Sequence, residues 1–250
     1  MSRMLIVANW KAYIEDLDKA KKLVALAKRL AREGDSEIVL APPAPFISAL
    51  AADNRSKVAF AAQDVSATTG GAMTGEATAP AYAAVGATYA IIGHSERRAL
   101  GETDAIVAEK VAHALAHGLT PIVCVGELVR DEEGHYLRFV REELRAALEV
   151  LTPKERGAVV VAYEPIWAIG KTAHDAIEPG ELDEMILYIR KVLAELLPGK
   201  SASRSRILYG GSVEPGNARD LAAASGINGF LVGHASVDPA IFTLLVRSLA

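Results

Sequence analysis

The stretch AVVVAYEP, from Ala158 to Pro165, is the part of the sequence that most directly predicts the fold. Apolar and aromatic residues continue without a polar interruption from Ala158 to Tyr163, and the charged Glu164 follows them. A half-exposed strand alternates apolar and polar side chains, whereas a strand covered on both faces is apolar throughout. The stretch therefore predicts a buried strand of a parallel sheet, with a carboxylate where the strand ends.

Similar runs recur along the chain, separated by longer segments with the period of a helix. The predicted strands are Leu5–Trp10, Glu37–Ala41, Val58–Gln63, Tyr89–Gly93, Pro121–Val125, Ala158–Glu164, Arg206–Tyr209 and Gly229–Val232. Between them, apolar residues repeat at intervals of three and four, which indicates one buried helix face. The clearest of these segments are Leu17–Ala31, Ile106–Leu115 and Leu182–Leu196.

Several residues mark where the predicted helices begin and end. Thr103 or Asp104 is the expected N-cap of the helix at 106–115, and Gly118 is the expected stop. Pro198 and Gly199 end the helix at 182–196. A last helix is expected to begin at Asp238-Pro239, because proline is favoured in a first helical turn.

Eight strand–helix units in 250 residues predict a (β/α)₈ barrel. The alternative is a doubly wound sheet, which usually places a glycine-rich phosphate turn after its first strand. Here the first strand runs into Asn9-Trp10-Lys11 instead. With no Pro/Gly/Ser-rich linker in the sequence, we expect one α/β domain over residues 1–250, an eight-stranded parallel barrel ringed by helices.

Composition narrows the class of protein. Hydrophobic residues make up 51% of the chain, which is typical of a folded domain with a large core. The net charge is −4 with mixed signs, so no basic stripe predicts nucleic-acid binding. No apolar run reaches the length of a membrane span, and the N-terminus lacks the pattern of a signal peptide. One cysteine permits no internal disulfide, and we expect a cytoplasmic protein.

Polar residues gather at the carboxyl ends of five predicted strands, where a barrel of this kind carries its active site. Each alone has an ordinary explanation: Lys11 as a solvated loop residue, His94 as a partly buried histidine, Glu164 as half of a structural ion pair with an arginine. Their convergence on one end of the barrel favours a site. The groups concerned are Asn9-Trp10-Lys11, Gly93 to Arg98, Glu164-Pro165, Gly210-Gly211-Ser212 and Gly233-His234.

This set of groups predicts proton transfer on a small phosphorylated carbonyl compound. A carboxylate takes a proton from a carbon beside a carbonyl when an imidazole and an ammonium stabilise the enediolate that results. Glycines and a serine at strand ends offer backbone N–H groups to a phosphate. The chemistry requires no cofactor, and the sequence has no Cys/His cluster at metal-binding spacing.

The sequence resembles the triosephosphate isomerase family over essentially its whole length. "IIGHSERR" at 91–98 and "AYEPIWAIG" at 162–170 are together highly specific. Further matching segments are Asn9-Trp10-Lys11, Thr74-Gly75-Glu76, Cys124 to Glu127, "YGGSV" at 209–213 and Phe230 to Gly233. The resemblance implies a TIM barrel and an isomerase of glycolysis and gluconeogenesis, which interconverts dihydroxyacetone phosphate and D-glyceraldehyde 3-phosphate without a cofactor.

The resemblance also implies catalytic roles. Glu164 is the expected base, His94 the neutral electrophile that polarises the carbonyl, and Lys11 the cation that stabilises negative charge. Asn9 lines the carbonyl side of the substrate. Ser95 is the expected partner of Glu164.

Supporting and binding roles follow from the same resemblance. Glu96 is expected to order the surroundings of Lys11 and His94, and Cys124 to be packed rather than reactive. The expected phosphate contacts are Gly170, Ser212, Gly233 and His234. The family is usually a homodimer, in which the loop around Thr74, Gly75 and Glu76 reaches the partner's site.

Four positions differ from the usual family pattern. A lid is predicted over Ile166 to Ile169, with Lys171, Thr172 and Ala173 as its far hinge. This lid is two residues shorter after Gly170 than is usual in the family, and His234 replaces the second glycine of a pair. The segment after Arg98 is about one residue shorter, and Tyr13 stands where asparagine is usual. These differences leave two alternatives open: an isomerase of a tetrulose phosphate, and a phosphate-ligand binding protein that has lost catalysis.

Overall fold

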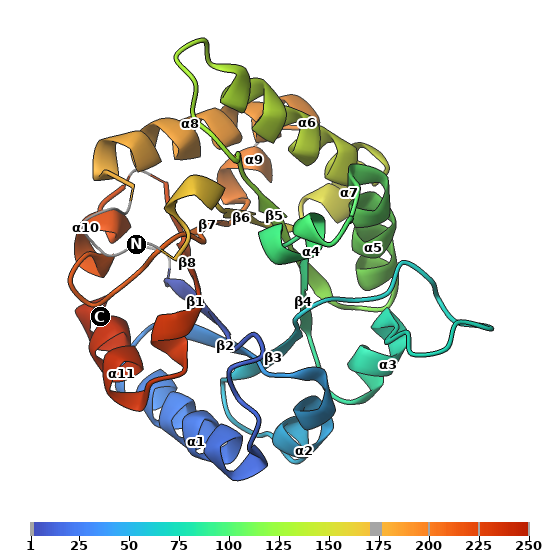
Figure 1. Ribbon diagram of the computed structural model, residues 1–250, viewed down its shortest axis with the longest axis vertical. Helices are drawn as coiled ribbons and strands as arrows, with labels where there is room; N and C mark the ends of the chain where they lie inside the picture. Colours follow the sequence, from blue (N-terminus) through green and yellow to red (C-terminus); the bar gives the residue numbers. More distant parts are fainter. Residues whose placement is uncertain (1–2, 171–176, 200, 225, 250) are drawn as a thin grey trace.

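The strands of the protein close into a barrel in which each strand pairs in parallel with the next along the chain, and β8 pairs with β1 (Figure 1). The structure is a computed structural model that describes residues 3–170, 177–199, 201–224 and 226–249. Its strands are β1 Leu5–Asn9, β2 Glu37–Ala41, β3 Ala59–Ala62, β4 Tyr89–Ile92, β5 Thr120–Val125, β6 Val160–Tyr163, β7 Ile207–Tyr209 and β8 Gly229–Val232.

Helices surround the strands as an outer ring (Figure 1). The α-helices are α1 Leu17–Glu33, α2 Ile47–Ala51, α3 Ala79–Ala84, α4 Ser95–Ala99, α5 Asp104–Ala116, α6 His135–Glu149, α7 Pro153–Arg156, α8 Pro179–Leu196, α9 Ser201–Arg204, α10 Ala218–Ala222 and α11 Pro239–Ser248. Short 3₁₀ helices are η1 Ala44–Phe46, η2 Ile166–Ala168 and η4 His234–Ser236. Among the residues described, no helix combines the length and the apolar character needed to cross a membrane. The predicted (β/α)₈ barrel is confirmed.

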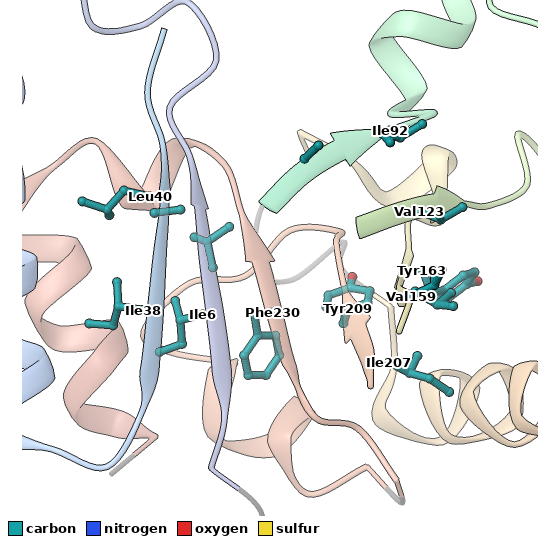
Figure 2. Packing of buried hydrophobic residues seen from close by; sticks show 14 of the residues in the cluster. Ile6, Ile38, Leu40, Ile92, Val123, Val159, Tyr163, Ile207, Tyr209 and Phe230 are labelled. Carbon is teal, nitrogen blue, oxygen red and sulfur yellow. The ribbon is translucent and has the colours of Figure 1, made fainter. Parts of the chain in front are cut away.

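Alternate side chains of each strand enter two different apolar clusters. In β1, Leu5 and Val7 belong to a cluster drawn from the strands alone, which fills the barrel. Ile6 and Ala8 belong to the cluster that also contains helix residues, so they pack between the barrel and its ring. Figure 2 shows side chains of this second cluster standing on neighbouring strands. Both faces are therefore apolar, which explains why the strands lack a polar alternation.

Several strands are shorter than the sequence predicted. Ala158 was expected to begin β6, but its N–H donates to Glu155 O (3.0 Å) in the turn that ends α7. Trp10 was expected to end β1, but Lys11 adopts a left-handed conformation (φ 45°) that turns the chain away. Local turns at the two ends of the barrel therefore remove residues that an apolar pattern alone assigns to strands.

The helix boundaries follow the predicted caps. Thr103 rather than Asp104 is the N-cap of α5, because its side chain accepts the N–H of Ile106. Asp238 caps α11 in the same way, with Pro239 as the first residue of the helix. Gly118 follows α5 with φ 77°, a left-handed conformation that glycine adopts without strain.

Closure of the barrel depends on Gly229, the first residue of β8. Leu5 of β1 pairs with Gly229, and the N–H of Leu5 donates to Asn228 O (2.8 Å). A Cβ atom at position 229 would lie 1.9 Å from Leu5 O, and the residue has φ 150°. A side chain here would therefore push β8 away from β1.

We expect Gly229→Ala to destabilise the fold by about 3 kcal/mol or more, because a backbone clash at a strand pair cannot relax cheaply. Urea denaturation at equilibrium measures the change. Gly180→Ala is the matched control, since Gly180 is exposed in α8 and has nothing within 4 Å of its added Cβ. The free energy of unfolding of this control should either stay unchanged or rise by up to about 1 kcal/mol. Equal stability of the two variants would contradict the role of Gly229 in closure.

Candidate active site

A cavity of about 330 Å³ opens at the carboxyl ends of the strands. Three of its lining residues are the predicted catalytic set, Lys11, His94 and Glu164. The others predicted from sequence to bind substrate also line it: Asn9, Gly170, Ser212, Gly233 and His234. Residues far apart in the sequence thus meet at one cavity. This was predicted from their positions at the carboxyl ends of the strands.

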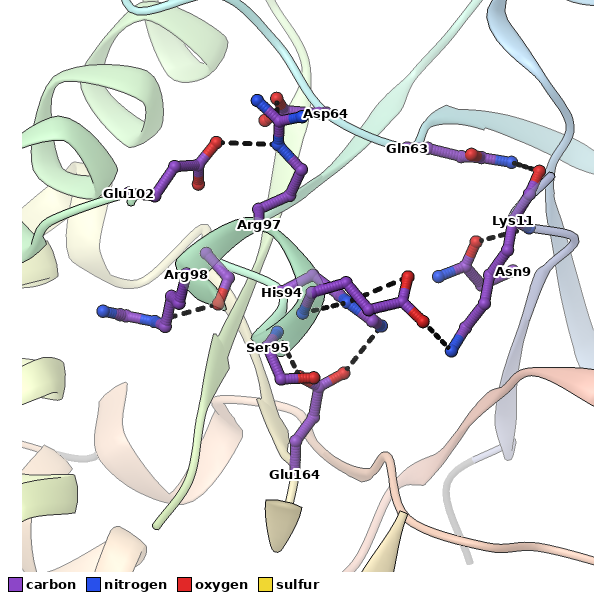
Figure 3. A network of polar contacts seen from close by, with 12 residues as sticks. Asn9, Lys11, Gln63, Asp64, His94, Ser95, Arg97, Arg98, Glu102 and Glu164 are labelled. Carbon is purple, nitrogen blue, oxygen red and sulfur yellow. Dashed lines mark hydrogen bonds and ion pairs between the residues drawn. The ribbon is translucent and has the colours of Figure 1, made fainter. Parts of the chain in front are cut away.

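Glu164 follows β6 and is almost fully buried, with 2% of its surface exposed. Its Oε2 accepts the backbone N–H of Ser95 at 3.0 Å, and its Oε1 lies 3.3 Å from His94 Nε2 (Figure 3). Oε1 has no hydrogen-bond partner among the residues described. Among the described residues, no arginine forms an ion pair with Glu164. The alternative that Glu164 is half of a structural ion pair with an arginine is therefore wrong. One oxygen is held, and the other is available for a proton.

His94 stands directly before helix α4 and acts as its N-cap. Its Nδ1 accepts the backbone N–H of Glu96 at 3.2 Å. A ring nitrogen that accepts a hydrogen bond carries no proton, so Nε2 carries the proton of the neutral ring. The imidazole therefore presents an N–H donor beside the carboxylate of Glu164 (Figure 3).

The backbone of Lys11 is held in a strained conformation by two side chains. Its φ of 45° is rare for a residue with a side chain and costs about 1–3 kcal/mol. The amide of Gln63 donates to Lys11 O (2.8 Å) and to Ala41 O (2.9 Å), and Asn9 Oδ1 accepts the N–H of Lys11 (3.0 Å). Gln63 was not predicted as a site residue, although its place at the end of a predicted strand was a usable signal.

The ammonium group of Lys11 is paired with Glu96. Lys11 Nζ lies 2.6 Å from Glu96 Oε1, and Glu96 Oε2 lies 3.8 Å from His94 Nδ1. Glu96 is the second residue of α4, whose own backbone N–H holds the imidazole. Glu96 thus contacts both residues that the sequence expected it to order.

Two glycines after β7 leave room for neighbouring side chains, Gly210 for Glu164 and Gly211 for Tyr209. A Cβ at Gly210 would lie 2.9 Å from Glu164 Cγ, and a Cβ at Gly211 would lie 2.2 Å from the hydroxyl of Tyr209. A glycine in an ordinary turn usually faces solvent, where a Cβ atom would meet no neighbouring side chain. The close approach explains why glycine occupies both positions.

The segment that follows Glu164 is anchored by Glu127. Glu127 is 1% exposed, and its Oε1 accepts Tyr163 OH and Trp167 Nε1, each at 2.8 Å. Burial and the Glu127 carboxylate raise the pKa of Tyr163, so the phenol stays protonated and donates. Glu127 lies in a segment that matches the family, but the sequence predicted no role for it. Its place after the fifth strand was the signal that could have identified it.

The predicted lid is described only in its first half. Residues 166–168 form η2, and Ser212 Oγ donates to Ala168 O at 3.0 Å. Ile169 and Gly170 line the cavity, and Gly170 has φ 71°. The predicted far hinge at Lys171, Thr172 and Ala173, where the lid differs from the usual pattern, lies outside the described residues.

Two residues that differ from the usual family pattern touch each other at the wall of the cavity. The rings of Tyr13 and His234 meet edge to face, with their centroids 5.7 Å apart at an angle of 85°. Gly233 lies nearby, since a Cβ there would be 3.6 Å from Lys11 Cε. Their contact could not be predicted, because Tyr13 and His234 lie near opposite ends of the sequence.

Outside the cavity, one group among the described residues has ligand atoms close enough to hold a metal ion. Asp131, Glu133 and His135 have ligand atoms within 4.8 Å of one another. Asp131 Oδ1 already accepts the N–H of His135 (2.9 Å) where α6 begins, and Glu133 and His135 are exposed. Helix capping explains this cluster without a metal.

Taken together, the fold and the cavity define a (β/α)₈-barrel enzyme with the groups for moving protons at a carbonyl compound. A carboxylate with one free oxygen faces an imidazole N–H, and an ammonium lies at the same cavity. They are the groups that the sequence predicted as the base, the electrophile and the cation of an enolisation.

Comparison with known proteins agrees with that class. The family model described as triosephosphate isomerase matches residues 4–249. The triosephosphate isomerase of Thermus thermophilus is 43% identical, with 99% of each chain covered. That of Moorella thermoacetica is 42% identical over 99% of each chain, and that of Chloroflexus aurantiacus is 42% identical over 97% of this chain and 98% of its own. The chain belongs to the triosephosphate isomerase family and is an isomerase.

We expect Gly210→Ala to lower kcat for the triose phosphates by about 10- to 100-fold, because its Cβ would displace the buried carboxylate of Glu164. KM should change little. Gly216→Ala is the matched control in the same loop, since nothing lies within 4 Å of its added Cβ, and it should keep wild-type kcat. Steady-state kinetics of both variants provides the measurement, and an unchanged kcat in Gly210→Ala would show that the close approach is unimportant.

Proposed function

We propose that this chain, as a single-domain enzyme of residues 1–250, interconverts dihydroxyacetone phosphate and D-glyceraldehyde 3-phosphate with Glu164 as its base. The observation that carries the assignment of roles is the buried Glu164 carboxylate, with Oε1 unbonded among the described residues and 3.3 Å from His94 Nε2. The reaction is a step of glycolysis and gluconeogenesis. A cytoplasmic location fits the single, buried Cys124.

In the proposed mechanism, Glu164 Oε1 removes a proton from the carbon beside the carbonyl. The electrons of the broken C–H bond form a carbon–carbon double bond, and the carbonyl oxygen gains negative charge. The Nε2–H of His94 and the ammonium of Lys11 stabilise this enediolate. His94 Nε2 donates its proton to the former carbonyl oxygen and takes up the proton of the hydroxyl on the neighbouring carbon, which becomes the new carbonyl. Glu164 then returns its proton to the former carbonyl carbon, which gives the isomer. The substrate is oxidised at one carbon and reduced at the next, so no cofactor is needed.

The remaining residues of the proposed site hold the reacting groups and the phosphate. The N–H of Ser95 fixes Oε2 of Glu164, so that Oε1 is directed to the substrate. Asn9 supports Lys11 and lines the carbonyl side. Backbone N–H groups at glycines and short helix starts bind phosphate well. We therefore assign the phosphate to the part of the cavity lined by Gly170, Ser212, Gly233 and His234.

We also propose a homodimer that forms through the loop carrying Thr74, Gly75 and Glu76. This loop joins β3 to α3 and extends outward from the barrel (Figure 1). Its three residues are exposed, and Met73 beside them exposes 56% of its surface. The base of the loop is rigid, because Asp64 accepts two hydrogen bonds from Lys110 (2.7 and 2.8 Å). A fixed loop with an exposed methionine is suited to insertion into a second copy.

The dimer is tested by sedimentation velocity at micromolar concentration, where we expect twice the mass of the chain. Met73→Asp should shift the protein toward monomer, because a charge at the loop tip would be buried without a partner. Leu244→Asp on α11 is the matched control, since Leu244 is also exposed and lies on another element, and it should stay dimeric. A wild-type monomer, or a dimer in Met73→Asp, would contradict the proposed interface.

We expect Glu164→Gln to reduce kcat by about 10²–10⁴-fold or more, because an amide cannot act as a general base. KM should change far less, since the amide keeps the size and an acceptor for the N–H of Ser95. A coupled assay in both directions measures the loss. Near-normal activity in this variant would remove Glu164 from the role of base.

The same assay of the wild-type protein separates the alternatives. Greater kcat/KM for a tetrulose phosphate than for either triose phosphate would favour the four-carbon isomerase. Calorimetric binding of a phosphate ligand without turnover would favour a binding protein. We favour the triose phosphates because the proton-transfer groups are complete and the Tyr13–His234 pair adds bulk to the cavity wall.

A further inference from the structure

We propose that Glu143 is a positioning residue for the isomerisation: from helix α6, outside the barrel, it holds the two chain segments that carry His94 and Glu164. The inference rests on the proposed function of those two residues. Glu143 does not line the cavity, and it is 2% exposed. A buried carboxylate needs compensating partners, and the partners that it has here lead to the active site from two directions.

The first connection runs through Gly126 to Glu164. Glu143 Oε2 accepts the backbone N–H of Gly126 at 2.8 Å. Gly126 packs directly on the base, since a Cβ there would lie 1.8 Å from Glu164 O and 2.5 Å from its carbonyl carbon. The N–H of Glu164 donates to the adjacent Val125 O at 2.8 Å. A shift of Gly126 would therefore move the backbone of the base.

The second connection runs through Arg98 to His94. Glu143 Oε1 lies 3.3 Å from Arg98 Nε, and the same Nε donates to Gly93 O at 3.0 Å. Gly93 precedes His94, and Arg98 belongs to α4, the helix that His94 caps. Figure 3 shows Arg98 directed away from the catalytic groups while it holds the backbone that carries them. Glu143 thus holds the guanidinium of Arg98, which in turn fixes the backbone just before α4.

The groups around Glu143 compensate the negative charge of its carboxylate only in part. Burial raises the pKa of Glu143 to about 7; Arg98 and the N–H of Gly126 oppose this, and Asp104 and Glu164 reinforce it. Arg98 is shared, because its Nη1 also pairs with Asp104 Oδ1 at 2.7 Å. The nearby thiol of Cys124 stays neutral, since burial raises its pKa well above the usual value.

The ionised and protonated forms of Glu143 should differ in how firmly they hold Arg98 and Gly126. The carboxylate attracts Arg98 and accepts from Gly126. The protonated acid keeps a carbonyl acceptor for Gly126 but loses the attraction to Arg98. Turnover should therefore decline as the pH falls through the pKa of Glu143, in addition to any decline that the catalytic groups themselves cause.

Three variants isolate this effect. Glu143→Gln imitates the protonated acid, because its amide oxygen can accept from Gly126 and its charge is fixed at zero. Glu143→Ala removes both contacts and leaves the N–H of Gly126 buried without a partner. Glu142→Gln is the matched control, the same change on the same helix at an exposed residue whose partner is Arg138 (2.7 Å). Each is assayed for kcat and KM from pH 5.5 to pH 9, a range that extends about 1.5 pH units below and about 2 above a group that titrates near 7.

We expect the ratio of wild-type kcat to Glu143→Gln kcat to be near 1 at low pH. Above neutrality it should rise to about threefold to tenfold, as for other residues that act on a site from a distance. Its midpoint should lie at about pH 7. Glu143→Ala should lose about 10- to 100-fold in kcat, with KM within about twofold of wild type. Glu142→Gln should follow wild type at every pH.

Thermal melting reports the protonation of Glu143 independently of activity. A carboxyl whose pKa is raised on folding keeps its proton in the native state while the unfolded chain releases it, so stability falls as pH rises between the two values. The wild-type melting temperature should therefore decline between the unshifted value of 4.5 and about 7 by more than that of Glu143→Gln. Glu142→Gln should show the wild-type decline.

Some outcomes would overturn the proposal. A kcat ratio that stays flat with pH, or a Glu143→Ala variant with wild-type kcat, would show that Glu143 does not position the site. A change in KM alone would also contradict it. If Glu143→Ala does not fold, Glu143→Gln and its pH profile decide. An inactive wild-type protein would refute the proposed function itself, whereas an active one with a flat ratio would refute only the role of Glu143.

Discussion

A buried carboxylate at the carboxyl end of β6 is the constraint on which the rest of the site depends. Taking such a charge out of water costs several kcal/mol unless hydrogen bonds or opposite charges compensate. Glu164 receives one backbone hydrogen bond, from Ser95, and among the described residues its second oxygen has none. A stability argument alone would place a cation there. The structure instead packs Gly126 against the main chain of Glu164 and Gly210 against its side chain, and one carboxylate oxygen stays without a hydrogen bond among the described residues.

The start of helix α4 connects Glu164 to the other polar groups of the site. His94, Ser95 and Glu96 follow one another, and each contacts a different partner: the ring of His94 accepts a helix N–H, Ser95 donates to Glu164, and Glu96 pairs with Lys11. One turn of helix thus sets the tautomer of the imidazole, the orientation of the Glu164 carboxylate and the place of the ammonium. Because helix N-termini carry unpaired N–H groups, they suit this purpose. A displacement of α4 would disturb all three contacts together, which is why its anchoring matters.

The sequence predicted most of the fold and the residues that line the cavity, but fewer of those that hold them. Strands covered on both faces are apolar throughout, so their order could be read, and polar residues such as Lys11 and Glu164 stood out at their ends. Gln63 also stands at the end of a predicted strand, but only the fold shows what it holds, because its partner Lys11 is 52 residues distant and contributes a backbone carbonyl. Glu143 reads as one of several charges on an amphipathic helix. Only packing shows that it is buried, and only the fold brings Arg98 and Gly126 to it.

Tyr13 and His234 show how a family site can differ without change to its proton-transfer groups. Each departs from the usual pattern, and because their rings touch, the two departures form one structural feature. An edge-to-face pair contributes about 0.5–1.5 kcal/mol beyond the area it buries, so either ring alone would lose a partner. Both rings line the cavity together with Gly233, one of the residues assigned to the phosphate. The pair therefore alters the wall near the proposed phosphate site, and a functional difference from other family members would arise in substrate binding rather than in proton transfer.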